Sequence, residues 1–206
     1  IGEAELKNQI KNNDFSNVYM IYGDEGYLKE FYVKKLKEKL VESAFADFNY
    51  HHYDGKKTPL SEILTDADMM PMMSSNTFLL VRDYPFDKSK EDVELLKEYL
   101  KDVNEAAVIV FWFDNLEIDT KKNAKLKALE AAVSKYGTAV ELNRKTESEL
   151  VRLVSSKVKK SGCTIDSANA QYLISVVGND LKTILNETEK ICNSLDGGEI
   201  TRKTID

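Results

Sequence analysis

The sequence holds few of the residues on which many active sites and metal sites depend. Its 206 residues include only two cysteines and two histidines. Cys163 and Cys192 lie in different helical segments of the C-terminal third. We expect buried free thiols of a reducing compartment there, with a disulfide or a metal site as the alternatives. His51 and His52 are adjacent in a predicted strand and so point to opposite faces, which argues against catalysis or metal binding through them.

Long apolar runs are also missing. The longest, residues 106–113, suits a buried strand and falls far short of the roughly 20 residues that span a bilayer. The first residues show no charged-then-apolar leader, so we expect neither secretion nor membrane insertion. The composition, 42% hydrophobic and 31% charged, is typical of a globular protein with a real core.

There is no excess of basic residues. The segment from Lys145 to Asp206 holds nine basic and nine acidic residues, so the first 144 residues carry the whole net charge of −6. A domain that grips nucleic acid through its phosphates usually has a basic excess. We therefore expect at most weak contact with DNA.

Predicted strands and helices alternate through the first two thirds of the chain. Strands are expected at 18–22, 48–53, 77–82, 106–113 and 138–142, the fourth being central and buried on both faces. This alternation predicts an α/β fold with a doubly wound parallel sheet over residues 1–143. From residue 144 to 206 we expect three or four helices and no strand, the first helix beginning with a capping box at Thr146 and Glu149.

A glycine-bearing loop follows the first strand and leads into an amphipathic helix. In nucleotide-binding α/β proteins such a loop reads G-x-x-x-x-G-K-[ST] and wraps backbone N–H groups around a phosphate. Here the second glycine comes too early, and no Lys-Ser or Lys-Thr pair follows. Two carboxylates lie where the loop should attract an anion. We expect a degenerate phosphate loop formed by Gly23, Asp24, Glu25, Gly26, Tyr27 and Leu28.

The other parts of a nucleotide hydrolase are missing too. An acidic pair at a strand end should bind Mg²⁺ and orient water, but the fourth strand is followed by Asp114 and Asn115. We interpret Asp114 as a strand-end or turn carboxylate. The sequence offers no Ser-His-Asp or Cys-His arrangement and no cluster with metal-ligand spacing. It indicates a binding module without catalytic residues, metal or cofactor.

Two motifs, one near each end of the chain, resemble those of a known family. One family motif reads roughly Y-G-x-E-x-Y-L, and Gly23, Glu25, Tyr27 and Leu28 match it. The other reads roughly G-x-D-L-x-x-L-x-N-E-x-x-K-L, and its matches are Gly178, Asp180, Leu181, Asn186, Glu187 and Lys190. The family is the delta subunit of the bacterial DNA polymerase III clamp loader, and the resemblance covers essentially the whole chain.

This resemblance implies an AAA+ domain over residues 1–143 and a helical lid over 144–206. It also implies a collar domain beyond Asp206, so we expect the chain to be a fragment. Such a subunit binds the sliding clamp (beta) and helps open the ring for loading onto primed DNA, without itself hydrolysing ATP. It meets the other clamp-loader subunits, gamma/tau and delta-prime, mainly through the collar. It acts in the bacterial cytoplasm, at the replisome, within a holoenzyme that is a nucleotidyltransferase.

In that family the clamp contact is a hydrophobic pair on a short helix just before the third strand. The corresponding segment here is Pro71, Met72 and Met73, where a Met-Met pair replaces the more usual Leu-Phe. Methionine is unbranched and polarizable, and it suits apolar pockets of several shapes. Upstream, Met69 and Met70 could supply the inward-facing residues. The alternative is that all four methionines belong to the core or to a crowded surface.

Other functions are open at this point. An active AAA+ ATPase with an atypical loop has support from Gly23, Gly26 and Asp114 only. A delta-prime-type subunit would share the fold, but that type carries a zinc-binding cysteine cluster and a Ser-Arg-Cys arginine finger, which this chain lacks. A DNA-binding protein is disfavoured by the acidic first domain.

Overall fold

The computed structural model describes residues 2–195 and 197–206. The chain folds into two compact units, Ile1–Asn143 and Arg144–Asp206, and each is described by itself.

The first unit is built on a five-stranded parallel sheet whose strand order is β2-β3-β4-β1-β5. The apolar strand β4 lies at its centre, as predicted, and Ile109 pairs with both Val18 and Leu79. Because both faces of this strand are covered, all but its last residue are buried. The strands are β1 (Val18–Tyr22), β2 (Tyr50–Asp54), β3 (Thr77–Arg82), β4 (Ala107–Trp112) and β5 (Thr138–Glu141).

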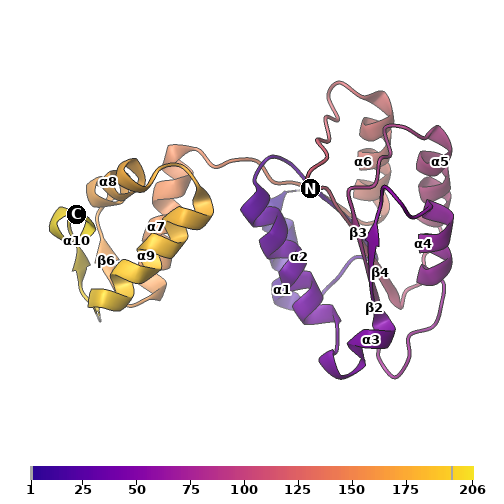
Figure 1. Ribbon diagram of the computed structural model, residues 1–206, viewed down its shortest axis with the longest axis horizontal. Coiled ribbons are helices and arrows are strands. Elements are labelled where there is room, and N and C mark those ends of the chain that lie inside the picture. The colour runs from indigo at the N-terminus through magenta and orange to yellow at the C-terminus, as the bar shows by residue number, and fades with distance from the viewer. Residues whose placement is uncertain (1, 196) are drawn as a thin grey trace. The chain divides into compact units, whose positions relative to one another are not determined.

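Helices cover both faces of this sheet (Figure 1). One face packs against α1 (Glu3–Asn12) and α2 (Gly26–Leu40), and the other against α4 (Leu60–Ala67), α5 (Lys90–Tyr99) and α6 (Ala124–Tyr136). The structure thus confirms the predicted doubly wound α/β architecture. The order of the strands brings the ends of β1, β4 and β5 together at the carboxyl edge of the sheet, where open α/β sheets bind ligands.

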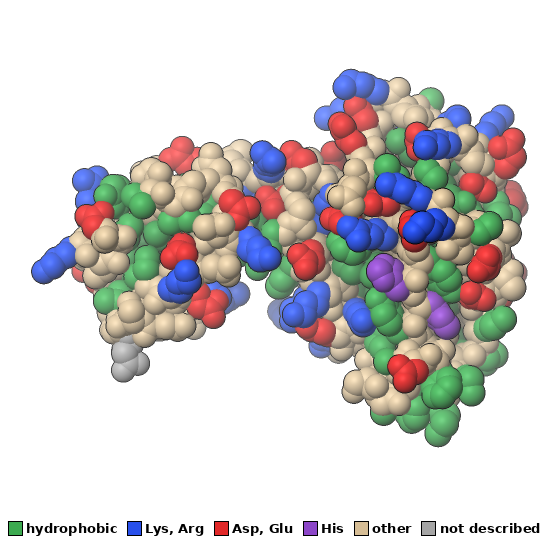
Figure 2. Space-filling model, viewed as in Figure 1, with side chains coloured by type: hydrophobic (Ala, Val, Ile, Leu, Met, Phe, Trp, Pro, Cys, Tyr) green, Lys and Arg blue, Asp and Glu red, His purple; other side chains and the backbone are tan. Residues whose placement is uncertain are grey.

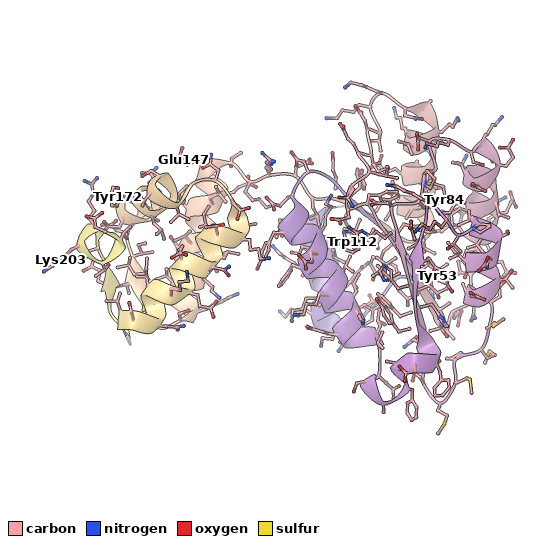
Figure 3. The ribbon with its side chains drawn as sticks, in the orientation of Figure 1. Tyr53, Tyr84, Trp112, Glu147, Tyr172 and Lys203 are labelled. Carbon is pink, nitrogen blue, oxygen red and sulfur yellow. The ribbon has the colours of Figure 1, made fainter. Side chains whose placement is uncertain are left out.

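An aromatic cluster fills the core beneath α4, α5 and α6. Phe86 packs against Tyr84 and Phe111, with ring centroids 4.5 and 5.2 Å apart. The Tyr84 hydroxyl accepts a hydrogen bond from the backbone of Leu60 at 3.1 Å and donates one to Asp92 at 2.9 Å (Figure 3). It therefore ties the starts of α4 and α5 to the loop after β3.

The second strand begins later than predicted. The strand expected from residue 48 begins at Tyr50, because Ala46–Asn49 forms the helical turn α3, preceded by a 3-10 turn at Ser43–Phe45. Helix α6 begins at Ala124, because the Asn123 side chain caps its first turn.

The second unit is mainly helical, with α7 (Glu147–Lys160), α8 (Ser167–Val177), α9 (Leu181–Leu195) and α10 (Arg202–Ile205). The predicted capping box at the start of α7 is present. Thr146 accepts from the Glu149 backbone at 3.4 Å, and the Glu149 carboxylate accepts from the Thr146 backbone at 2.8 Å.

A small parallel ribbon corrects the expectation that no strand follows residue 143. Thr164–Ile165 (β6) pairs with Glu199–Ile200 (β7). Two residues are too few for a periodic signal in the sequence. Next to this ribbon, Cys163 and Cys192 are buried and unbridged, as predicted.

No helix in the described part of the chain has the length and apolarity needed to cross a bilayer.

The alkaline stability of the first unit tests the packing of Tyr84. Burial, followed by the hydrogen bond to Asp92, raises the pKa of Tyr84 to about 12, whereas an unfolded tyrosine titrates near 10. Between these values the folded state holds a proton that the unfolded state has lost. The free energy of unfolding therefore falls as pH rises. We expect Tyr84→Phe to remove up to about 1.4 kcal/mol of this fall per pH unit, measured by urea unfolding between about pH 9 and 11.

Tyr136, which is exposed, provides the matched control. Tyr136→Phe removes a tyrosine hydroxyl outside the core, and the stability of Tyr84→Phe should fall less steeply with pH than that of Tyr136→Phe. A Tyr84→Phe variant that loses stability as steeply as the parent would contradict the assigned role.

Candidate functional site

The glycine loop after β1 is closed against the end of β5 by its own backbone. The Glu25 N–H donates to the Leu142 carbonyl at 2.9 Å, and the Leu142 N–H donates to Tyr22 at 2.7 Å. Gly23 has φ +115°, and a Cβ there would lie 2.3 Å from the Leu142 oxygen. Only glycine permits this approach.

The start of α2 carries a carboxylate of the protein's own. The Glu25 side chain accepts from the Tyr27 N–H at 3.2 Å and so caps the helix. Leu28, one residue further on, is buried in the core. One N–H group at the helix start, where an active loop would bind a phosphate, thus already donates to a carboxylate of the protein.

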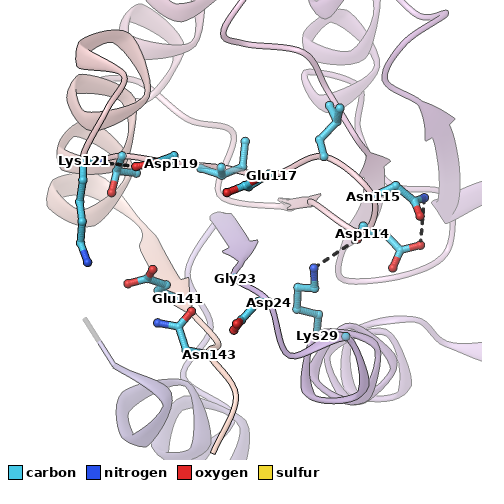
Figure 4. A pocket seen from close by; sticks show the side chains of 14 residues that line it. Gly23, Asp24, Lys29, Asp114, Asn115, Glu117, Asp119, Lys121, Glu141 and Asn143 are labelled. Atoms are coloured by element: carbon cyan, nitrogen blue, oxygen red, sulfur yellow. Dashed lines mark hydrogen bonds between the residues drawn. The ribbon is translucent and has the colours of Figure 1, made fainter.

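Lys29 is a site residue that the sequence analysis missed. Counted strictly from Gly23, the motif G-x-x-x-x-G-K-[ST] places Lys29 at the lysine, but Leu28 replaces the second glycine and Glu30 the hydroxyl residue. Lys29 is 4% exposed. Its ammonium donates to the carbonyls of Phe113 at 2.7 Å and Asp114 at 3.3 Å (Figure 4). Burial lowers its pKa, against the opposing effect of nearby carboxylates.

A cavity of about 510 Å³ opens at the carboxyl ends of β1, β4 and β5, between the glycine loop and the segment after β4 (Figure 4). Carboxylates outnumber ammonium groups on its wall, so its potential repels a polyphosphate. The charged residues that line it are Asp24, Lys29, Asp114, Glu117, Asp119, Lys121 and Glu141.

The carboxylates after β3 and β4 are engaged within the protein. Asp114 pairs with the guanidinium of Arg82. Asp83 accepts from the backbone N–H groups of Asp114, Asn115 and Leu116 at 2.9–3.1 Å. Burial alone would raise the pKa of Asp83, but these hydrogen bonds hold it below its ordinary value. This geometry fits a turn-forming role for both carboxylates.

A second candidate site is the methionine loop, residues 68–76, which connects α4 to β3. It is not the expected short helix, and Met73 has φ +55°. Met72 is 55% exposed and Met73 77%. The expectation that Met69 and Met70 face inward was wrong, because they are 58% and 78% exposed. Because the loop is not helical, none of the four methionine side chains has to point towards the core.

Phe48 extends this apolar area. It lies on α3, one residue before Asn49, and is 56% exposed. The Asn49 side chain accepts from the Met72 N–H at 2.7 Å and donates to the Met72 carbonyl at 2.8 Å. Hydrophobic side chains gather at the α3 end of the unit (Figure 2). We call the set the apolar surface: Phe48, Met69, Met70, Met72 and Met73.

The apolar surface and the acidic cavity lie at opposite edges of the sheet. The methionine loop leads into the start of β3 and α3 into the start of β2, whereas the cavity follows the ends of β1, β4 and β5. All five strands run parallel, so these are the amino and carboxyl edges.

The motif from Gly178 to Lys190 has a structural setting in the second unit. Gly178 ends α8 with φ +93°. At the start of α9, Asp180 accepts hydrogen bonds from the Thr183 hydroxyl at 2.5 Å and from the Thr183 N–H at 2.8 Å, and these bonds lower its pKa. Leu181 is buried. Further along, Asn186 is exposed, while Glu187 and Lys190 form an exposed ion pair at 2.7 Å.

The glycine loop yields a test of the fold around the cavity. Gly23→Ala should lower the free energy of unfolding by about 2 kcal/mol or more, because it combines positive φ with a clash against Leu142. Gly26 has no positive φ and an added Cβ would meet no atom within 4 Å. Gly26→Ala should therefore shift stability by less than about 1 kcal/mol. If urea unfolding gave the same loss of stability for both substitutions, the close approach of Gly23 to Leu142 would be disproved.

Comparison with known proteins gives matches along both units. The model of the family described as DNA polymerase III, delta subunit, matches residues 19–136, and one described as a middle domain matches residues 146–206. The DNA polymerase III subunit delta of Bacillus subtilis is 26% identical over 200 residues, which cover 93% of this chain and 56% of the relative. A probable subunit delta of Aquifex aeolicus is 25% identical over 181 residues, which cover 84% of this chain and 49% of the relative.

Solved structures agree on the fold. The Bacillus subtilis DNA clamp loader delta protein superposes with a TM-score of 0.78 at 23% identity, over 98% of this chain and 60% of that one. The RuvB Holliday junction branch migration motor of Thermotoga maritima gives 0.51 at 14% identity, over 100% of this chain and 67% of that one. These likenesses confirm the predicted AAA+ fold. The chain spans about half the length of the curated relatives it matches.

Proposed function

Because the chain belongs to the family of DNA polymerase III delta subunits, we propose that it binds the sliding clamp through Met72 and Met73, next to Pro71. In this role it helps to open the ring for loading onto primed DNA, and it does so without hydrolysing ATP.

The observation that carries this proposal is the apolar surface. Five of the nine large hydrophobic side chains exposed in the described residues belong to it. Exposed apolar groups gathered on one surface mark a binding site for another protein. Burying a methionine side chain in a pocket contributes about 1.5–3 kcal/mol, so two anchors contribute about 3–6 kcal/mol. The surrounding contacts must supply the rest of the roughly 8 kcal/mol that micromolar binding requires.

Binding to the clamp of the same organism tests this role. We expect micromolar or tighter binding by surface plasmon resonance, weakened at least about 10-fold, or 1.4 kcal/mol, in Met72→Ala/Met73→Ala. Met69→Ala/Met70→Ala is a matched control, since it removes the same side chains at nearly the same exposure. It should weaken binding by less than about threefold, as residues around a hot spot do.

A stable complex of the Met72→Ala/Met73→Ala variant would refute the assigned contact. Equal losses in both double variants would show that apolar area alone, and no defined anchor, drives the association.

Two observations support the absence of ATP hydrolysis. The cavity is acidic, and the glycine loop, Glu25 and Lys29 are hydrogen-bonded to groups of the protein itself. At millimolar Mg-ATP we expect no shift of the melting temperature, whereas a ligand present at about 100 times its Kd would stabilise the protein by about 2.7 kcal/mol. Lys29→Ala serves as the control. A shift in the parent that this variant abolishes would revive the alternative of an active ATPase with an atypical loop.

The remaining partners follow from the same proposal. We assign contacts with gamma/tau and delta-prime mainly to a collar domain outside these residues, and activity to the bacterial cytoplasm at the replisome. The net negative charge of the first unit favours at most weak contact with DNA.

A further inference from the structure

The methionine loop is held in its shape by side chains outside it. It is not helical, and Met73 adopts a positive φ that non-glycine residues rarely take. Such a conformation persists only where the surroundings over-determine it. The four exposed methionine side chains add little packing, so the constraint must act on the backbone.

Two asparagine side chains supply that constraint at different points. Asn104 donates to the carbonyl of Ala67 at 2.9 Å and to that of Met69 at 3.4 Å, which fixes the start of the loop. Asn49 acts in the middle, where it bonds both backbone groups of Met72. Its amide nitrogen also donates to the Phe45 carbonyl at 3.1 Å.

Asn49 behaves as a replacement for a strand partner. It offers an acceptor and a donor to the same residue, as a neighbouring strand would, and it is only 3% exposed. A buried amide that loses such partners is strongly disfavoured. The contact also fixes the loop to α3, on which Phe48 lies.

We infer that Asn49 is a positioning residue that holds Met72, Met73 and Phe48 in one preformed docking surface. The identity of the partner, the sliding clamp, rests on the proposed function. The fixing of Met72 by Asn49 does not. Preformed surfaces bind more tightly because their ordering cost is met before association.

Asn49→Ala tests the inference with two measurements. In the isolated chain, hydrogen exchange by NMR should show the Met72 amide protected in the parent and at least about 10-fold less protected in the variant. In plasmon resonance, affinity for the clamp should fall at least about 10-fold, although no apolar side chain has been removed.

Asn104→Ala is the control, since it removes a half-buried amide that bonds the other end of the same loop. It should leave the Met72 amide protected. If Asn49→Ala does not fold, Asn49→Asp keeps the acceptor for the Met72 N–H and loses the donor to the carbonyl. This variant should retain the protection of the amide and still bind more weakly.

The two hypotheses fail in different ways. A folded Asn49→Ala variant that binds the clamp as the parent does would overturn the positioning role and leave the proposed function intact. A parent that does not bind the clamp would overturn the proposed function. In that case hydrogen exchange alone tests whether Asn49 fixes Met72, and unchanged protection of the Met72 amide in Asn49→Ala would overturn the inference.

Discussion

Polar backbone groups at the carboxyl edge of a parallel sheet need partners, and in this protein they find them internally. The ammonium of Lys29 donates hydrogen bonds to the carbonyls that follow β4, and the Asp83 carboxylate accepts hydrogen bonds from the N–H groups of the next turn. Leu142 closes the glycine loop. Buried polar groups without partners are costly. The backbone groups named here are thus hydrogen-bonded within the protein, with no ligand required.

The acidic cavity and the apolar surface are separate features at opposite edges of the sheet. The carboxyl edge keeps a cavity, but its carboxylates oppose phosphate. The apolar surface lies at the amino edge, on the methionine loop and on α3, which Asn49 connects by hydrogen bonds. The same sheet can therefore carry an acidic cavity at one edge and an exposed apolar surface at the other.

Features that depend on local pattern could be predicted from the sequence. The central strand follows from its continuous apolar run, and the capping box of α7 from residues three apart. Features that depend on pairs distant in the chain could not. Lys29 meets Phe113 across 84 positions and Asn49 meets Met72 across 23, and no periodicity reports such pairs.

The same limit explains the errors in the methionine loop. A short helix was a reasonable expectation for residues 72–76, because no local sequence pattern predicts the positive φ of Met73. The exposure of Met69 and Met70 follows from the backbone path that Asn49 and Asn104 impose. In both cases the deciding contacts come from residues more than twenty positions away from the loop residue that they contact.

A surface made of exposed thioethers also has a redox chemistry. Oxidation adds one oxygen to a methionine sulfur and turns a flexible apolar side chain into a polar, chiral one, and sulfoxide reductases reverse the change. Each of the four methionines of the apolar surface is open to solvent by more than half. An oxidant can therefore erase the apolar character of this surface without touching the core, and a reductase can restore it.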